Sequence, residues 1–337
     1  MGECLLRCGL CGHRQRVAFG HDCAGAVSVV DPEKSEIAID PYFTETLAAL
    51  QSRASLSGVQ PKVFVVKTQN RFRAAMPGEL STHIAKLPSK AHADLIEVEW
   101  LTTKAMRALL PGEPVVDLEI DDLPGVAGEA LMIKRFDRTN EMERIHFEEF
   151  NTLLGNRAID KYEGSYEQMG SFIQHERVCI PAERERLYRR ILACFLLGNM
   201  DAHLKNFAMS HVGGGLRLSP AYDLVASAVY KEYTISLSVS GASNLRLSDL
   251  MPKHLLRMAS GFGLSEEVVM LAVEDFRKRR GAMTEAIYAD PVASTPIKLD
   301  LLILVDKRWN RTFELVGTVL SKKRKGGEKL KGFRKCG

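Results

Sequence analysis

Five polar residues have the types and the order along the chain that phosphoryl transfer from ATP requires. Residues 198–206 read Gly-Asn-Met-Asp-Ala-His-Leu-Lys-Asn, so Asp201 and Asn206 lie five positions apart. This is the spacing at which an Asp base and an Asn metal ligand serve phosphoryl transfer. Asp223 follows in Ser-Pro-Ala-Tyr-Asp, while Lys86 and Glu99 lie upstream, thirteen residues apart. The order Lys, Glu, Asp, Asn, Asp predicts an ATP-dependent phosphotransferase.

Each of the three downstream residues has a definite part in such a reaction. The transition state of γ-phosphoryl transfer is loose and strongly anionic, so the protein mainly positions groups and neutralises charge. Asp201 is expected to accept the proton of the attacking hydroxyl group. Asn206 and Asp223 are expected to hold Mg²⁺, a hard cation that prefers oxygen ligands and shares its shell with phosphate oxygens. A lone Asp after a helix is usually a turn residue, but this ordered set favours catalysis.

The upstream pair is predicted to hold the ATP phosphates. Lys86 lies in the apolar run His-Ile-Ala-Lys-Leu and would grip the α- and β-phosphates, with Glu99 holding the ammonium in place. The alternative is a lysine that extends from an edge strand and a glutamate on a solvated helix face. Glu97 competes with Glu99 for the same role.

Hydrophobic patterns predict a β-rich first part and a helical second part. Strands are expected at 62–67, 71–76, 83–87, 114–120 and 129–135, with a helix after Asp94 that Pro111-Gly112 ends. Helices are expected at 147–154, 166–175, 182–198 and from Pro252 almost to the end, with a hairpin of 206–210 and 216–218 between them. The predicted fold class is α+β and bilobal, with lobes 1–138 and 139–337 that meet near Asp137-Arg138-Thr139-Asn140.

The composition is that of an ordinary globular protein. Of 337 residues, 45% are hydrophobic and 26% charged. No stretch approaches the length of a transmembrane helix, and the first residues lack the pattern of a signal peptide, so a cytoplasmic protein without membrane contact is expected.

Positive charge gathers at the C-terminal end. Residues 322–337 hold eight Lys or Arg and one Glu, a balance of +7, so the rest of the chain carries about 4 − 7 = −3. Such a tail could contact nucleic acid weakly through phosphates, or it could be the solvated end of a helix. The second interpretation is favoured.

The cysteines are unevenly placed. Four of the seven, Cys4, Cys8, Cys11 and Cys23, lie near the N-terminus with His13 and His21. They could ligate zinc, but the second ligand pair is irregular, and free thiols on a short N-terminal element are favoured. Cys194 is expected in the core.

The segment Ser55-Leu-Ser-Gly-Val-Gln-Pro-Lys62 precedes the first predicted hairpin. It has one glycine where a phosphate-covering loop usually has three, so a simple turn is the alternative. Its position immediately before the hairpin favours the phosphate-covering function.

Several linked motifs together resemble the HipA family of bacterial toxin kinases. They are Ser-x-Ser-Gly-x-Gln-x-Lys, His-Ile-x-Lys, Lys-Arg-Phe-Asp-Arg at 134–138, Gly-Asn-x-Asp-x-His-x-Lys-Asn and Ser-Pro-x-Tyr-Asp. The resemblance runs from about Asp22 to the C-terminus, and the length is closer to HipT, the shorter kinase of three-component systems.

The resemblance implies a serine/threonine protein kinase that uses ATP and Mg²⁺ and autophosphorylates a serine of the Gly-rich loop, here Ser55 or Ser57. Two ordinary turn serines are the alternative. A phosphate beside the ATP phosphates is repelled unless a cation compensates it. Implied ATP contacts are Ser57, Gly58, Val59, Gln60, Pro61, Lys62, Lys86, Lys134, Arg135, Phe136, His203, Lys205, Asn206, Tyr222 and Asp223.

The resemblance also implies partners. Family kinases phosphorylate aminoacyl-tRNA synthetases and pair with a HipB-like helix-turn-helix antitoxin, and a small HipS-like subunit accompanies the shorter kinases. DNA contact is then expected through the antitoxin or weakly through the basic tail. Three departures stand out: Lys134 occupies a position often held by Glu, Asp223 is followed by Leu-Val, and no Arg precedes Asp201. Activation-loop control of the eukaryotic type is therefore not expected.

Two other functions remain open from the residues. A small-molecule kinase could use the same Asp, Asn and Asp, as aminoglycoside-type kinases do. A kinase-fold scaffold or co-repressor could bind an antitoxin and DNA without catalysis, although the complete catalytic set disfavours it.

Overall fold

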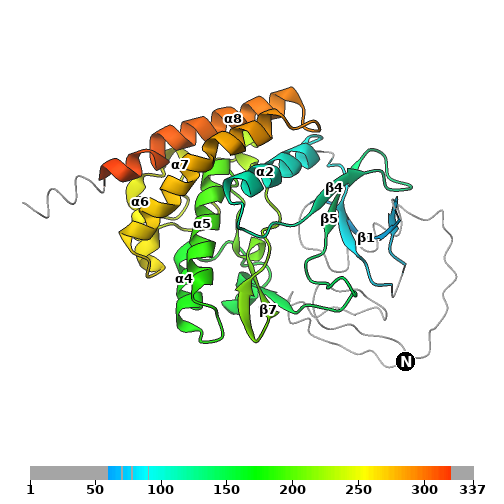
Figure 1. Cartoon of the computed structure of the whole chain (residues 1–337), viewed down its shortest axis with the longest axis horizontal. Helices are drawn as coiled ribbons and strands as arrows, with labels where there is room; N and C mark the ends of the chain where they lie inside the picture. The colour runs from blue at the N-terminus through cyan, green and yellow to red at the C-terminus, as the bar shows by residue number, and fades with distance from the viewer. Residues whose placement is uncertain (1–59, 70, 77–78, 90, 320–337) are drawn as a thin grey trace, which may run out of the picture. The chain divides into compact units, whose positions relative to one another are not determined.

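The computed structural model describes residues 60–319 apart from residues 70, 77, 78 and 90 (Figure 1). The predictions for Ser55, Ser57, Gly58, Val59, the N-terminal cysteines and the basic tail lie outside the described residues. The chain forms two compact units, each made of several segments. Unit one holds the described residues up to Trp100 with Pro114–Lys161 and Lys205–Asp223; unit two holds Leu101–Glu113, Tyr162–Leu204 and the described residues from Leu224.

Unit one contains an antiparallel five-stranded sheet in the order β2-β1-β3-β5-β4. Its strands are β1 (Lys62–Thr68), β2 (Arg71–Ala74), β3 (His83–Lys86), β4 (Leu118–Asp121) and β5 (Ala130–Lys134). Alternate residues of a strand face the same side, and Val63, Val65, Phe72, Ala85 and Met132 form a buried cluster in this way. The sheet places β3 between β1 and β5, so the strand that carries Lys86 is central.

A second sheet in unit one consists of β6 (Phe147–Glu149), β7 (Ala208–Val212) and β8 (Gly215–Leu218), in that order. The β7–β8 turn uses Gly213 and Gly214 at φ values of 60° and 81°, a region that glycine enters without steric cost. The hairpin therefore leads the chain from Asn206 to Asp223.

The predicted helix at 147–154 is wrong over its first three residues. Phe147 and Glu149 pair with Ser210 and Ala208 of β7, and only Phe150–Leu153 form a helix, α3. Short apolar runs do not separate strand from helix by period alone, and pairing with β7 decides the outcome here.

Helix α2 (Leu95–Leu109) contains the division between the two units. It begins after Asp94, whose carbonyl accepts a hydrogen bond from Val98 N–H at 3.0 Å, and it ends before Pro111, as predicted. Val98, Leu101, Ala105 and Leu109 are buried, which agrees with their helical spacing.

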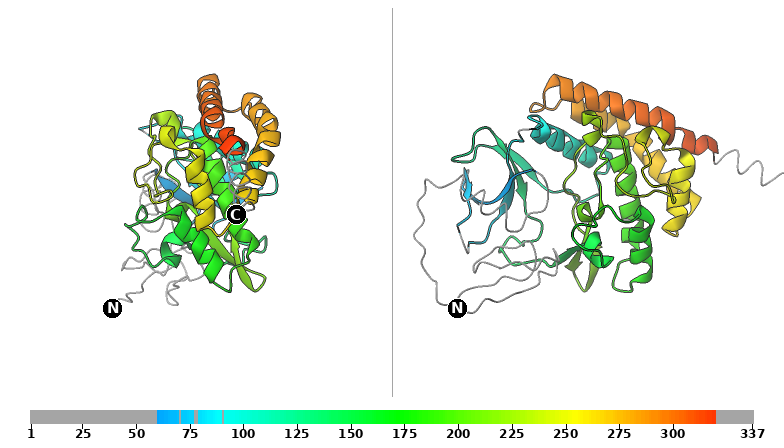
Figure 2. Two further views of the ribbon diagram at one scale, coloured as in Figure 1. Left: turned by 90° about the vertical axis from the view of Figure 1, so that its left-hand side faces the viewer. Right: turned by 180° about the vertical axis from the view of Figure 1, so that it is seen from behind.

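Unit two is mainly helical (Figure 2). Its longer helices are α4 (Tyr166–His175), α5 (Ala182–Leu197), α6 (Pro252–Gly261), α7 (Glu266–Tyr288) and α8 (Thr295–Arg308), followed by a π-helical turn, η4 (Trp309–Phe313). Helix α5 packs against α4 and α8, and its C-terminal half is buried, including Cys194 as predicted. No helix in the described part of the chain is long and apolar enough to cross a membrane.

Candidate active site

Lys86 is the centre of a buried ion-pair cluster in unit one. Its Nζ lies 2.6 and 2.5 Å from the two carboxylate oxygens of Glu99 and 2.5 Å from Oδ1 of Asp223. The residue is 4% exposed. Burial alone would lower the pKa of Lys86, but the carboxylates of Asp223 and Glu99 outweigh it and raise that pKa above its ordinary value. Lys86 therefore keeps its charge.

Glu99, rather than the nearby Glu97, is the glutamate of α2 that contacts Lys86. Glu99 is 2% exposed, and burial raises its pKa against the opposing effect of Lys86. A buried carboxylate is stable only when it is paired and hydrogen-bonded. The alternative that the sequence left open, a lysine on an edge strand and a glutamate on a solvated helix face, is therefore wrong. Both side chains are buried, and β3 is a central strand.

Asn206 and Asp223 meet at the ends of the β7–β8 hairpin. Asn206 Nδ2 donates to Asp223 Oδ2 at 2.6 Å, and the short 3₁₀ turn η1 (Leu204–Asn206) precedes β7. Asp223 has φ 55°, a left-handed conformation that costs an L-residue about 1–2 kcal/mol. Such strain persists where the surrounding structure holds it, and it is frequent at functional sites.

The donors at this position fit magnesium. A carboxylate and a side-chain amide supply the hard oxygen atoms that Mg²⁺ prefers. Asp223 keeps 36% of its side chain exposed while Asn206 is 7% exposed. The carboxylate is therefore accessible to a ligand, and the amide is fixed beside it.

Lys62 lies directly opposite Lys86 in the β1–β3 register. Burial lowers the pKa of Lys62, while Asp223 acts in the opposite direction. Two like charges directly opposite each other destabilise a sheet. A bound anion, such as a phosphate group, would offset this repulsion between Lys62 and Lys86.

Glu149 and Lys205 form a second ion pair, with Lys205 Nζ 3.7 Å from Glu149 Oε2. Burial raises the pKa of the Glu149 carboxyl to about 7, although Lys205 acts to lower it. The sequence reasoning missed Glu149. Only a prediction of strand β6 would have identified it. The register of β6 against β7 places Glu149 opposite Ala208, two residues after Asn206.

The segment that follows β5 is fixed by its arginine. Arg135 donates to both carboxylate oxygens of Asp137 at 2.9 and 2.7 Å and to Ser81 Oγ at 2.6 Å, and it is buried over the Phe64 ring. The Arg135 guanidinium is therefore engaged within the protein, whereas Lys134 is exposed. An ATP contact from this segment remains a prediction.

Aromatic stacking links two of the predicted ATP-binding residues. The ring of Phe136 stacks on Tyr222 at a centroid distance of 5.3 Å, and Tyr222 Oη donates to the carbonyl of Lys205 at 2.8 Å. Among the described loop residues, Gln60 Nε2 donates to the Leu87 carbonyl at 2.8 Å, and Pro61 is exposed. These contacts fix Phe136, Tyr222 and Gln60 in unit one, which also holds Lys86 and Lys62.

Asp201 belongs to unit two and is exposed. Tyr162 Oη donates to Asp201 Oδ1 at 2.9 Å, and the Tyr162 ring meets the buried His203 edge-on at 5.2 Å. The backbone N–H of His203 donates to the Asp201 carbonyl at 2.8 Å. Tyr162 is a second residue that sequence reasoning missed, since no motif contains it.

The chain enters the Asp201 segment through Gly198. This residue caps α5 at φ 75°, ψ 25°, the left-handed C-cap that glycine provides. Its carbonyl accepts a hydrogen bond from Ala228 N–H at 3.0 Å. Further along, Tyr166 Oη donates to the Ala202 carbonyl at 3.0 Å. Both ends of this short segment are thus tied to the helical unit.

Comparison with known proteins identifies the family. Residues 54–283 match the HipA-like C-terminal domain. The chain belongs to the HipA-like family. It is 30% identical to Y4dM of Sinorhizobium fredii, a protein provisionally named as a kinase, over 80% of this chain and 68% of that protein. It is 26% identical to the serine/threonine-protein kinase toxin HipA of Shewanella oneidensis, over 75% of this chain and 65% of that one.

Solved structures give the same result for the fold. HipA of Shewanella oneidensis, in a complex with HipB and operator DNA, matches with a TM-score of 0.70 at 22% identity, covering 87% of this chain and 77% of that chain. The proinflammatory kinase CtkA of Helicobacter pylori matches with a TM-score of 0.58 at 14% identity, covering 81% and 95%. The predicted HipA-like α+β kinase fold is confirmed.

Proposed function

We propose that this HipA-like chain is a serine/threonine protein kinase that uses ATP and Mg²⁺. The observation that carries the proposal is the contact of Lys86 with both Glu99 and Asp223, beside Asn206. A buried lysine held by a helix glutamate, next to an amide and a carboxylate suited to Mg²⁺, is the constellation that phosphoryl transfer uses. Family membership supports the same activity.

The residues have separate parts in this reaction. Lys86 and Lys62 would bind phosphate oxygens, and Glu99 orients Lys86. Asn206 and Asp223 would hold Mg²⁺, which neutralises charge that develops on the phosphates. Asp201, assigned from its spacing to Asn206, would accept the proton of the attacking hydroxyl.

The test is transfer of radiolabelled γ-phosphate from ATP to the full-length protein and to a generic serine/threonine substrate. We expect Mg²⁺-dependent labelling by the wild type and its loss in Asp201→Asn. Asp300→Asn, an exposed substitution on α8, is the matched control and should keep full activity. Equal labelling by wild type and Asp201→Asn would contradict the proposal, and turnover confined to sugars or aminoglycosides would indicate a small-molecule kinase instead.

The finer role we propose is that of a toxin in a bacterial toxin–antitoxin system, with an aminoacyl-tRNA synthetase as substrate. The support is similarity to a protein named as a HipA kinase toxin and, in fold, to a HipA solved with HipB and operator DNA. A HipB-like antitoxin, with or without a HipS-like subunit, would then bind this chain and mediate contact with DNA. Growth arrest on induction that Asp201→Asn abolishes, together with phosphopeptides from one synthetase, is the expected result. Arrest that persists unchanged in Asp201→Asn would favour a non-catalytic scaffold or co-repressor.

Autophosphorylation of Ser55, Ser57 or both is the remaining part of the proposal. Mass spectrometry after incubation with ATP should find phosphate on one of these serines and, in Asp201→Asn, on neither. Labelling of other serines only would contradict this assignment while leaving kinase activity intact.

A further inference from the structure

Two histidines and a glutamate meet on one face of the three-stranded sheet of unit one. His211 lies in β7, and His146 directly precedes β6. The backbone N–H of His211 donates to the His146 carbonyl at 2.9 Å, which continues the register in which Phe147 opposes Ser210. His146 and His211 are therefore cross-strand neighbours with side chains on the same face.

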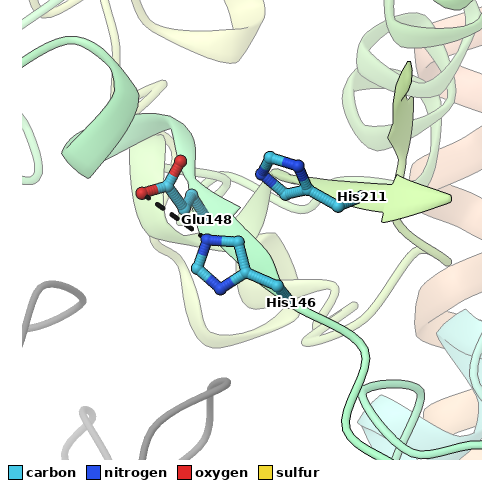
Figure 3. Close-up of side chains that lie close together, drawn as sticks. All are labelled: His146, Glu148 and His211. Atoms are coloured by element: carbon cyan, nitrogen blue, oxygen red, sulfur yellow. Dashed lines mark ion pairs between the residues drawn. The ribbon is translucent and has the colours of Figure 1, made fainter. Parts of the chain in front are cut away.

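Glu148 joins the two histidines because it follows His146 by two residues, and residues two apart on a strand share a face. Figure 3 shows the three side chains close together: Glu148 from β6, His146 from the residue before β6, and His211 from β7. The two imidazole centroids are 4.7 Å apart, and His146 Nε2 lies 3.9 Å from Glu148 Oε1. One ligand atom from each residue lies within 4.8 Å of the others.

None of these three side chains makes a hydrogen bond to any residue that the structure describes. The 3.9 Å separation of His146 Nε2 and Glu148 Oε1 is too long for one, and His146 Nδ1 is buried without a partner. A buried polar atom left without a hydrogen-bond partner destabilises the folded state. The cluster thus gathers three strong ligand groups that make no hydrogen bond within the described part of the chain and are linked to one another only by the 3.9 Å ion pair and the ring contact.

We propose that His146, Glu148 and His211 bind a divalent first-row transition metal ion, for which Zn²⁺ is the probe. Imidazole nitrogen and carboxylate oxygen are standard zinc ligands at about 2.0–2.2 Å, so ligand atoms around one tetrahedral ion lie about 3.3 Å apart. The side chains are half-buried or exposed, and one ligand atom of each already lies within 4.8 Å of the others, so metal binding requires side-chain rotation that shortens these separations to that spacing. Three protein ligands leave a fourth position for water.

The site differs in chemistry from the proposed magnesium ligands. Mg²⁺ prefers oxygen donors throughout its shell, whereas two imidazoles favour Zn²⁺, Ni²⁺ or Cu²⁺. A bound ion would link the segment before β6 to β7, the strand that follows Asn206, and Glu148 adjoins the Glu149 that pairs with Lys205. The expected consequence is a metal-dependent stabilisation of this sheet, because an ion that binds only the folded state stabilises it.

The experiment is a titration of the full-length protein with Zn²⁺ by calorimetry and with Co²⁺ by absorption, without nucleotide. The comparison is between wild type, His211→Ala and the control His92→Ala, an exposed histidine outside the cluster. His211 is exposed, so its replacement should leave the fold intact, and far-ultraviolet circular dichroism checks this. The cobalt spectrum separates this site from the N-terminal cysteines, because thiolate ligands add a charge-transfer band that imidazole and carboxylate do not.

We expect the wild type and His92→Ala to bind one ion at this site. His211→Ala should not bind that ion, or should bind it at least about tenfold more weakly. The reason is that losing even an outer partner of a metal site lowers metal affinity about 10–100-fold. The cobalt complex of that ion should lack the thiolate band, and Glu148→Gln should weaken it as well. Equal stoichiometry and affinity in wild type and His211→Ala would overturn the proposal. So would zinc bound only with thiolate character.

Discussion

Replacing Glu149 by glutamine is a direct test of the electrostatics of unit one. Burial raises the pKa of this carboxyl to about 7 from its ordinary 4.5, in spite of Lys205 at 3.7 Å. The folded state therefore binds the Glu149 proton more tightly than the unfolded state does. The stabilisation that this proton brings is fully present below pH 4.5 and is lost as the pH rises through about 7.

The size of the effect follows from that difference. The pKa of about 7 in the fold exceeds the ordinary pKa of 4.5 by 7 − 4.5 = 2.5. This difference corresponds to about 3.4 kcal/mol at about 1.36 kcal/mol per pKa unit. The Glu149 side chain is 18% exposed, so solvent screening reduces this to about 2–3 kcal/mol. Glutamine cannot ionise, and part of this difference lies below pH 5. The stability of Glu149→Gln relative to wild type should therefore rise by about 1–2 kcal/mol between pH 5 and pH 8.

The two tryptophans of the chain allow each unit to be followed by itself. Trp100 belongs to unit one and Trp309 to unit two, so urea unfolding in a Trp309→Phe background, with chelator and without nucleotide, reports on unit one. Glu143→Gln, an exposed change in the same unit, is the control and should show no such trend. A stability difference that stays constant or falls with pH would refute the reasoning, because it would mean that Lys205 keeps Glu149 ionised in the fold.

Three further substitutions follow from the contacts of the two units. Lys86→Met leaves two carboxylates without their cation and should destabilise unit one by about 3–5 kcal/mol, whereas Lys67→Met, at an exposed pair, should cost less than about 1 kcal/mol in the same Trp100 unfolding assay. Gly198→Ala should lower the unfolding temperature of unit two, which the fluorescence of Trp309 reports. A φ of 75° costs alanine about 1–2 kcal/mol, and the new Cβ would collide with a side chain of α8. Gly281→Ala, in open space on α7, is the control and should not lower it. Tyr162→Phe removes the hydrogen bond to the proposed base and should lower kcat about twofold to tenfold without changing either unfolding transition; an unchanged kcat would contradict this role.

Most regular elements could be predicted because their local signals agree with the final fold. Helix α4 has a capping box of Ser165 and Gln168 in the structure, and α2 combines an acidic residue at its start with Pro111 after its end. Local and tertiary preferences coincide in such elements. The error at Phe147–Glu149 arose where they differ, since a three-residue strand exists only through its partner β7.

The candidate site divides in a similar way. Spacing along the chain was enough to single out Lys86, Asn206 and Asp223, and it left Glu99 and Glu97 as alternatives for the partner of Lys86. The structure brings Lys86, Asn206, Asp223 and Glu99 together in unit one. Glu149 could not be found in this way, because nothing in its neighbourhood distinguishes it from an exposed glutamate. Its importance comes from burial and from Lys205, both of which depend on a register that no local pattern encodes.

The two carboxylates that Lys86 contacts are not equivalent, and their difference indicates how the cluster would work. Glu99 is 2% exposed on α2 and contacts Lys86 through both oxygens, so it acts as a fixed counter-charge. Asp223 is 36% exposed, lies at a left-handed φ of 55° and shares its oxygens between Lys86 and Asn206. A charged ligand can therefore take the place of Lys86 or Asn206 as a partner of Asp223. Lys86 would still be paired with a carboxylate in that case, because its contact with Glu99 does not change. The arrangement allows exchange at the accessible carboxylate while the buried pair preserves the geometry.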